Sequence, residues 1–118
     1  MRHQKKKITL DRKVASRNAL IAGLAESLIL REKIRTTKAK ARAVKSFTER
    51  LVTVAKKNTL AARRDLIVKL YTPNAVKKLM EVLGPRYKDR NGGYTRLTTV
   101  SGVRKGDAAE TAIVEFIK

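Results

Sequence analysis

The sequence predicts an α+β fold, with about four helices packed on a small three-stranded mixed sheet. Three observations carry this prediction. Apolar residues recur at helical spacing through most of residues 11–83, the part after residue 93 is rich in β-branched residues, and a short β-branched segment separates the first two helical patterns. A chain of 118 residues suits one domain with a modest core. We therefore expect a basic N-terminal arm, residues 1–10, and a single domain over residues 11–118.

The first predicted helix begins after Asp11, which we expect to act as its N-cap, and runs to about Glu32. Val14, Ile21 and Leu28 fall on one face of this helix. The opposite side carries small residues, which favours close packing on another helix over contact with an RNA backbone.

A short strand over residues 33–37 follows, and its last threonine is the predicted N-cap of a second helix over about residues 38–57. Val44, Phe47 and Leu51 form the apolar face of that helix. Cations lie on its opposite side, where they could line phosphates or simply be solvated. Lys40 departs from this pattern, but it lies in the first turn and can reach past the helix end.

Two further helices are expected over about residues 60–71 and 73–83. Asn58 or Thr59 caps the first of them, and Thr72 followed by Pro73 is typical of a helix start. Gly84 and Pro85 together predict that the fourth helix stops there.

Residues 94–100 and 111–117 read as the remaining strands. The second is a nearly continuous apolar run, which suits a central or well-covered strand. We expect these two strands to pair in antiparallel fashion across a long loop, with residues 33–37 completing the sheet.

Charge is the strongest functional signal. The chain has 29 Lys and Arg residues against 10 Asp and Glu, a net charge of +19. Such an excess repels itself unless an anionic partner neutralises it, and nucleic acid is the commonest partner of this kind. The alternative is a surface that is merely solvated. The cations concentrate in residues 1–17, 31–50 and 84–105. Three separate basic segments favour binding to several parts of one folded RNA over recognition of a single groove of a duplex.

The segment over residues 84–96 combines glycines, arginines and tyrosines. Glycine allows sharp turns, guanidinium groups fork onto phosphates, and tyrosine rings can stack on bases. We interpret it as a basic loop running into a strand and shaped for RNA; the alternative is an ordinary connector. Tyr94 is the candidate for stacking, or for a hydrogen bond to a phosphate or 2′-hydroxyl. Its alternative, shared by Tyr87, is packing on a helix.

Catalytic and metal-binding motifs find no support in the sequence. Cysteine is absent, His3 is the only histidine, and no P-loop or nucleophile elbow occurs. No apolar run reaches the roughly 18 residues of a membrane-spanning helix. We expect a non-enzymatic, soluble, cytoplasmic protein without cofactor, metal, membrane or small-molecule substrate. The main rival is a basic architectural DNA-binding protein, because the third and fourth helices superficially form a helix-turn-helix. The fourth offers only Lys77 and Lys78 as cations, however.

Several motifs along the chain match one known family. They include Met1-Arg2-His3, the run from Leu24 to Leu28, Lys33 to Thr37, Leu83 to Tyr87, Gly92 to Arg96, and Arg104 to Asp107. In this order and spacing the chain resembles the bacterial large-subunit ribosomal protein seventeen family, from which it departs at Ser16 and at Ala22-Gly23. The resemblance implies an α+β domain and a structural role. It also implies binding to large-subunit ribosomal RNA near the exit of the peptide tunnel, beside other ribosomal proteins.

The predicted RNA-binding residues are basic side chains from the three charged segments, together with one tyrosine. They are Arg2, Lys5, Lys6, Lys7, Arg17, Lys38, Arg42, Arg86, Arg90, Tyr94, Arg96, Arg104 and Lys105. Arg35 is not among them, because a strand position can bury the stem of the side chain.

Overall fold

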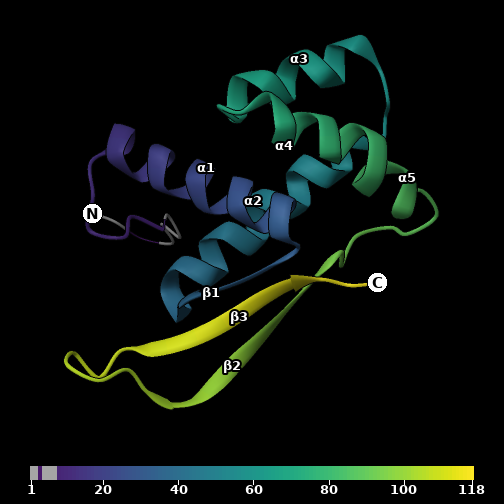
Figure 1. The fold of residues 1–118 in the computed structure, drawn as a ribbon. Helices are drawn as coiled ribbons and strands as arrows, with labels where there is room; N and C mark the ends of the chain where they lie inside the picture. Colours follow the sequence, from purple (N-terminus) through teal and green to yellow (C-terminus); the bar gives the residue numbers. More distant parts are fainter. Residues whose placement is uncertain (1–2, 4–7) are drawn as a thin grey trace.

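The computed structural model describes residue 3 and residues 8–118. The predicted phosphate contacts Arg2, Lys5, Lys6 and Lys7 lie outside the described residues, and with them most of the predicted arm. The described part is an α+β fold in which helices cover one face of a three-stranded sheet (Figure 1). The helices are α1 (Val14–Arg31), α2 (Lys38–Ala55), α3 (Leu60–Lys69) and a composite last helix built from α4 (Pro73–Lys78), the π-helical turn η1 (Leu79–Leu83) and α5 (Gly84–Arg86). The predicted fold class, with about four helices, is confirmed.

The sheet contains β1 (Lys33–Thr37), β2 (Thr95–Val103) and β3 (Glu110–Phe116) in the order β1-β3-β2. Both pairings are antiparallel, so the expectation of a mixed sheet is wrong in that detail. β1 and β2 do run in the same direction, but β3 lies between them and no parallel pair forms. The predicted central place of the last strand is confirmed, and its inward residues Ala112, Val114 and Phe116 are buried.

The start of α1 differs from the prediction. Lys13 occupies the N-cap position and makes no side-chain cap, whereas Asp11 has a positive φ of 53° and lies outside the helix. The chain turns here, because the Arg12 amide donates to the Thr9 carbonyl at 3.1 Å. At the other end of α1, Glu32 adopts a left-handed conformation with φ 64° and its amide bonds the Leu28 carbonyl. This left-handed residue turns the chain directly into β1.

Gly84 and Pro85 do not stop the last helix, contrary to expectation. The Gly84 amide bonds the Leu79 carbonyl five residues back, and the chain stays helical to Arg86. Proline in a regular helix clashes with the carbonyl four residues back, and the wider π turn accommodates it. Gly84 also allows close packing on α2: a Cβ atom there would lie 3.1 Å from the Leu79 carbonyl oxygen and 3.2 Å from that of Ala55.

Helix α2 lies at the centre of the molecule and contacts all three strands as well as α1, α3 and η1. Val44, Leu51 and Val52 fill the core from this helix. Its Glu49 side chain accepts hydrogen bonds from the backbone amide of Thr95, at 3.2 Å, and from its hydroxyl, at 2.8 Å. Helix α2 thereby fixes the start of β2. A basic pocket lies at each of its two ends.

Candidate nucleic-acid interface

A basic pocket lies where β1, the first turn of α2 and the β2–β3 hairpin meet. It has a volume of about 380 Å³ and six lining residues, three of them cations and three threonines: Arg35, Thr36, Thr37, Lys40, Arg104 and Thr111. We call it the hairpin pocket. No acidic side chain lines it. Guanidinium, ammonium and hydroxyl groups all donate hydrogen bonds, so the pocket is suited to an anion with several oxygen atoms, such as a phosphate.

Strand register explains why residues so far apart in sequence share this pocket. β1 pairs with β3 so that Arg35 lies opposite Ile113 and Thr37 lies opposite Thr111. The Arg35 Nη2 donates to the Thr111 hydroxyl at 3.4 Å. β2 pairs with β3 on the edge away from β1, and the hairpin formed by β2 and β3 extends past the end of β1 before it turns (Figure 1). That turn returns Arg104 to the pocket.

The hairpin tip is held by a local ion pair. The Arg104 guanidinium donates to both carboxylate oxygens of Asp107, through Nε at 3.0 Å and through Nη2. This hydrogen bonding, with a further bond from the Ala109 amide, lowers the pKa of Asp107 to about 2. Gly102 and Gly106 supply positive φ angles of 83° and 99° in the turn. Two of the five N–H groups of Arg104 are used in this way, and the other three are left for a ligand.

A second basic pocket lies at the opposite end of α2. It has a volume of about 430 Å³, and Lys56, Lys57 and Lys88 line it together with Asn58 and apolar residues of α2, η1 and α5. We call it the α5 pocket. An 18-residue helix is about 27 Å long at 1.5 Å per residue, so the two pockets are separated by roughly that distance. Two separated cationic points can hold two segments of one folded polyanion.

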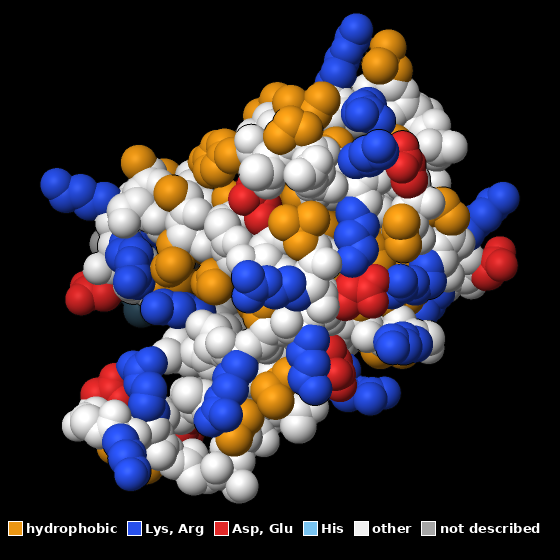
Figure 2. All heavy atoms as spheres, viewed as in Figure 1, with side chains coloured by type: hydrophobic (Ala, Val, Ile, Leu, Met, Phe, Trp, Pro, Cys, Tyr) orange, Lys and Arg blue, Asp and Glu red, His pale blue; other side chains and the backbone are white. Residues whose placement is uncertain are grey.

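A third group of charged side chains lies on the outer face of the sheet. Lys33, Glu115 and Arg96 are aligned across the three strands, and each cation lies 3.9 Å from a Glu115 carboxylate oxygen. Two cations for one acid leave this row positive. Helices cover only the other face of the sheet, and Figure 2 shows lysine and arginine side chains over the sheet and hairpin in the lower part of the view.

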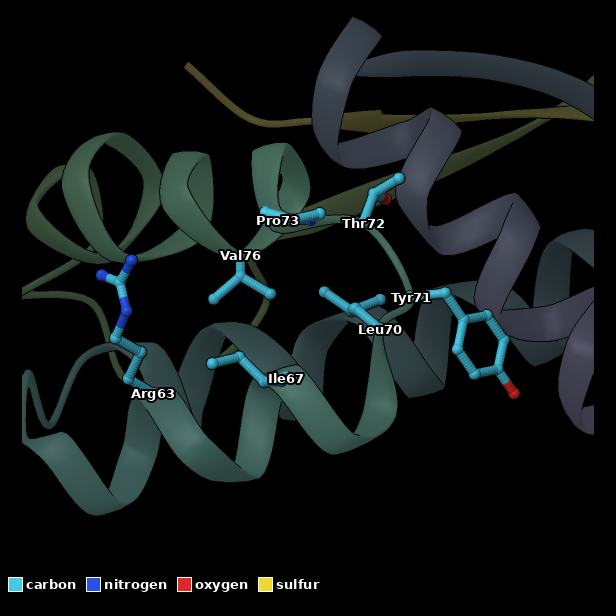
Figure 3. A pocket seen from close by; sticks show the side chains of 7 residues that line it. All are labelled: Arg63, Ile67, Leu70, Tyr71, Thr72, Pro73 and Val76. Carbon is cyan, nitrogen blue, oxygen red and sulfur yellow. The ribbon is translucent and has the colours of Figure 1, made fainter.

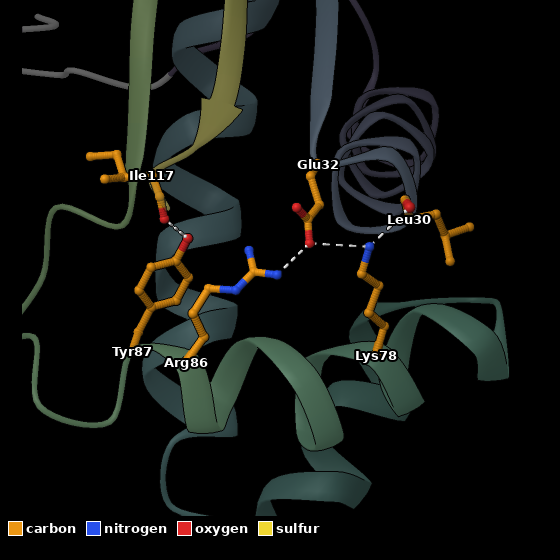
Figure 4. A network of polar contacts seen from close by, with 6 residues as sticks. All are labelled: Leu30, Glu32, Lys78, Arg86, Tyr87 and Ile117. Carbon is orange, nitrogen blue, oxygen red and sulfur yellow. Dashed lines mark hydrogen bonds and ion pairs between the residues drawn. The ribbon is translucent and has the colours of Figure 1, made fainter.

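Arg86 has a partner inside the protein. Its Nη2 lies 2.7 Å from Oε1 of Glu32, and the Lys78 Nζ lies 3.4 Å from the same oxygen (Figure 4). The hydrogen bond from Arg86 lowers the pKa of Glu32 and raises that of Arg86 itself. Lys78 also donates to the Leu30 carbonyl at 3.0 Å, and the Tyr87 hydroxyl donates to the Ile117 carbonyl. These contacts connect the last helix to the end of α1 and to the end of β3.

The Glu32 network predicts a pH-dependent contribution to stability. Because the folded-state pKa lies below the ordinary 4.5, the carboxylate stabilises the fold above that pH, and the contribution is lost as pH falls through the folded value. We expect Glu32→Gln to lower the free energy of unfolding by about 1 kcal/mol near neutral pH. Urea unfolding at pH 7 and below pH 4 measures this: the difference from the unsubstituted protein should shrink at low pH. A difference that is constant with pH would contradict an ionic role.

Tyr94 is not a stacking platform. Its side chain is only 2% exposed, and its ring lies 5.2 Å from that of Tyr87, which packs in turn on Phe116. The Lys56 Nζ donates to the Tyr94 hydroxyl at 3.0 Å and to the Arg90 carbonyl at 2.5 Å. A buried ring offers no face to a base, so the stacking role is wrong, whereas the hydrogen bond to a phosphate or 2′-hydroxyl stays a prediction; both tyrosines pack within the fold.

The other predicted residues are spread around the molecule. Lys38 lies near the hairpin pocket and 3.5 Å from Glu110, and Lys105 is exposed at the hairpin tip. Arg42 and Arg90 are exposed, and Arg17 is half-buried on α1. Among the predicted residues that the structure describes, only Arg104 lines the hairpin pocket; Lys38 and Lys105 each directly follow a lining residue in the sequence.

Five basic residues of the two pockets were not predicted from the sequence: Arg35, Lys40, Lys56, Lys57 and Lys88. A signal existed for the first of these. Side chains alternate along a strand, so Lys33 and Arg35 share a face, and that face is the exposed one. For Lys56, Lys57 and Lys88 no comparable local pattern exists, because their proximity depends on how the last helix packs on α2.

The fold and these charges define a small, strongly basic α+β protein whose surface is suited to a polyanion. Residues 20–117 match the model of the family described as Ribosomal protein L17, and the chain belongs to this family. It is a family of structural ribosomal components, and the chain is not an enzyme.

Three relatives are similar in sequence over nearly the whole length of this chain. The chain is 46% identical over 118 residues to the large ribosomal subunit protein bL17 of Hydrogenobaculum sp., with all of both chains covered. It is 47% identical over 117 residues to the protein of the same name from Solibacter usitatus, covering 99% of this chain and 77% of that one. The Rickettsia bellii protein is 46% identical over 117 residues, covering 99% and 82%.

Within residue 3 and residues 8–118, no helix is long and apolar enough to cross a bilayer. The same residues contain no group of three or more His, Cys, Asp or Glu side chains that could hold a metal ion.

Proposed function

We propose that this chain is a structural constituent of the large ribosomal subunit that binds large-subunit rRNA, near the exit of the peptide tunnel and beside other ribosomal proteins. The hairpin pocket is the observation that carries the RNA contact: three cations and three hydroxyl groups line it, and the acid nearest to them in the hairpin, Asp107, uses only two of the N–H groups of Arg104. The tunnel-exit position rests on the family relationship alone.

The contact is to the RNA backbone. Phosphate oxygens fit the donors of the hairpin pocket and the lysines of the α5 pocket, which lie roughly 27 Å apart along α2. The outer sheet face adds Lys33 and Arg96 between them. Tyr87 and Tyr94 are buried and offer no ring face to a base, so recognition by this side of the molecule depends on the shape that places phosphates at these points.

Salt dependence of binding tests this proposal. The logarithm of the binding constant for purified large-subunit rRNA, measured by filter binding between 50 and 300 mM KCl, should fall linearly with the logarithm of salt concentration. About six phosphate contacts would cost on the order of 10³-fold between 50 and 200 mM. A flat response would exclude a phosphate-dominated contact, and equal affinity for duplex DNA of the same phosphate content would favour an architectural DNA-binding protein.

A further inference from the structure

Apolar side chains remain exposed on the side of the molecule formed by α3 and α4. Along α3 and just after it, Ile67 is 53%, Tyr71 69% and Val68 78% exposed, and Leu60 is exposed as well. Figure 2 shows hydrophobic side chains gathered over this region, at the top of the view. Helix α3 buries only Ala62 and Leu66, so most of its apolar surface is not used by the protein's own core.

Two pockets open on this surface, one on each side of Tyr71. The first, of about 300 Å³, lies between α3 and α4 and is lined by Arg63, Ile67, Leu70, Tyr71, Thr72, Pro73 and Val76 (Figure 3). The second, of about 290 Å³, lies among α1, α2 and α3 and includes Ile21, Phe47 and Val68. Each is large enough to receive apolar side chains, and mostly apolar linings with a few polar groups are typical of binding pockets.

The exposed tyrosine is fixed in position. The Glu26 Oε1 on α1 accepts hydrogen bonds from the backbone amides of Tyr71, at 2.7 Å, and Thr72, at 3.0 Å. The backbone between α3 and α4 is thereby held against α1, and the Tyr71 ring extends outward from a rigid point. A rigid aromatic anchor flanked by pockets is typical of interface hot spots, because little conformational entropy is lost on binding.

Charge identifies the occupant. Arg63 lies at one end of the first pocket and Arg64 is exposed beside it, and neither has an acidic partner among the described residues, whereas Asp65 is paired with Lys69 at 3.4 Å. A second copy of a chain with net charge +19 would bring like charges together. RNA phosphates could pair with the two arginines, but the RNA backbone has no apolar groups to fill the two pockets and would lose hydration against their side chains.

We propose that the α3–α4 surface docks an acidic amphipathic segment of a neighbouring protein in the large ribosomal subunit. Apolar side chains of that segment occupy the two pockets on either side of Tyr71, and its carboxylates pair with Arg63 and Arg64. That the partner belongs to the large ribosomal subunit rests on the proposed function. The docking itself uses a different side of the molecule from the hairpin pocket.

Site-specific crosslinking in purified large subunits tests the proposal. Benzoylphenylalanine is placed at position 71, and at Val103 on the hairpin as a matched exposed control; the crosslinked segment is identified by mass spectrometry. We expect position 71 to crosslink to a protein segment that is rich in acidic and apolar residues. A crosslink to rRNA, to a second copy or to a basic segment would overturn the proposal, as would a yield of protein crosslinks no higher than that from position 103.

A substitution gives a second readout. Val68→Asp places a carboxylate against the acidic partner and should reduce the crosslink yield from position 71 at least tenfold, while Val103→Asp should leave it within twofold. Because Val68 is so exposed, both variants should keep the thermal midpoint. The affinity of Val68→Asp for purified rRNA should be unchanged, whereas Val103→Asp, next to Arg104 of the hairpin pocket, should weaken it, so a failure of docking and a failure of RNA binding are distinguished. Equal crosslink yields from the two variants would overturn the proposal.

Discussion

Replacing Arg35, Lys40 and Arg104 together by glutamine is expected to weaken binding to large-subunit rRNA on the order of 100-fold at 0.15 M salt. All three line the hairpin pocket, and glutamine keeps polar atoms while removing the charge. The logarithmic salt slope should fall by about two to three, roughly one for each phosphate contact removed. Filter binding over a salt series measures both quantities.

The matched control removes the same charge elsewhere. Arg63, Arg64 and Lys77 are exposed on α3 and α4, away from the hairpin, and their replacement by glutamine lowers the net charge equally. This control should retain most of the affinity and the salt slope. If both triple variants lose affinity to the same extent, the protein binds through its overall charge, and the hairpin pocket has no special role. Circular dichroism confirms that each variant is folded.

Gly84→Val is expected to destabilise the fold by about 1–3 kcal/mol. The added Cβ would lie 3.1 and 3.2 Å from two backbone carbonyl oxygens, those of Leu79 and Ala55, and the two further methyl groups of valine need still more space. Backbone atoms cannot rotate away as a flexible side chain can, so η1 and α2 must separate. The thermal midpoint should fall on the order of 5–10 °C.

Gly23→Val is the control for this prediction. Gly23 is also helical and exposed on α1, but beyond its chain neighbours and the adjacent backbone of its own helix no atom lies within 4 Å of its hypothetical Cβ. Since glycine and valine both have low helix propensity, this substitution should change stability little. Similar losses at the two positions would show that helix propensity, and not the contact between η1 and α2, sets the effect.

Local patterns in the sequence were sufficient to predict the elements of this fold. The periodicity of α2, the Thr72-Pro73 start of α4 and the β-branched runs depend only on neighbours in sequence, and the corresponding elements lie where they were predicted. The helix stop predicted at Gly84-Pro85 is wrong because of a tertiary contact. Packing on α2 stabilises a π turn, and the helix continues through the proline.

The candidate site could be predicted only in part. Its composition was readable, since Arg104 and Lys105 stand out as a basic turn. The hairpin pocket itself needs the register of β1 on β3, which brings residue 35 close to residue 104, and no local pattern specifies that register. The stacking role predicted for Tyr94 was wrong for the same kind of reason. The burial of its ring depends on Tyr87 and on Lys56 at the end of α2, both of which lie outside the strand that follows Tyr94.

The order β1-β3-β2 leaves two open strand edges, and an open edge is a template for aggregation. β1 is only five residues long and carries Lys33 and Arg35. β2 is longer, but its register on β3 shifts between Thr99 and Val103, and Arg96 lies on its exposed face. Short length, irregularity and positive charge all discourage another copy from adding a strand. The same cations that are proposed to hold RNA are therefore also expected to discourage self-association of newly made protein before it meets its partner.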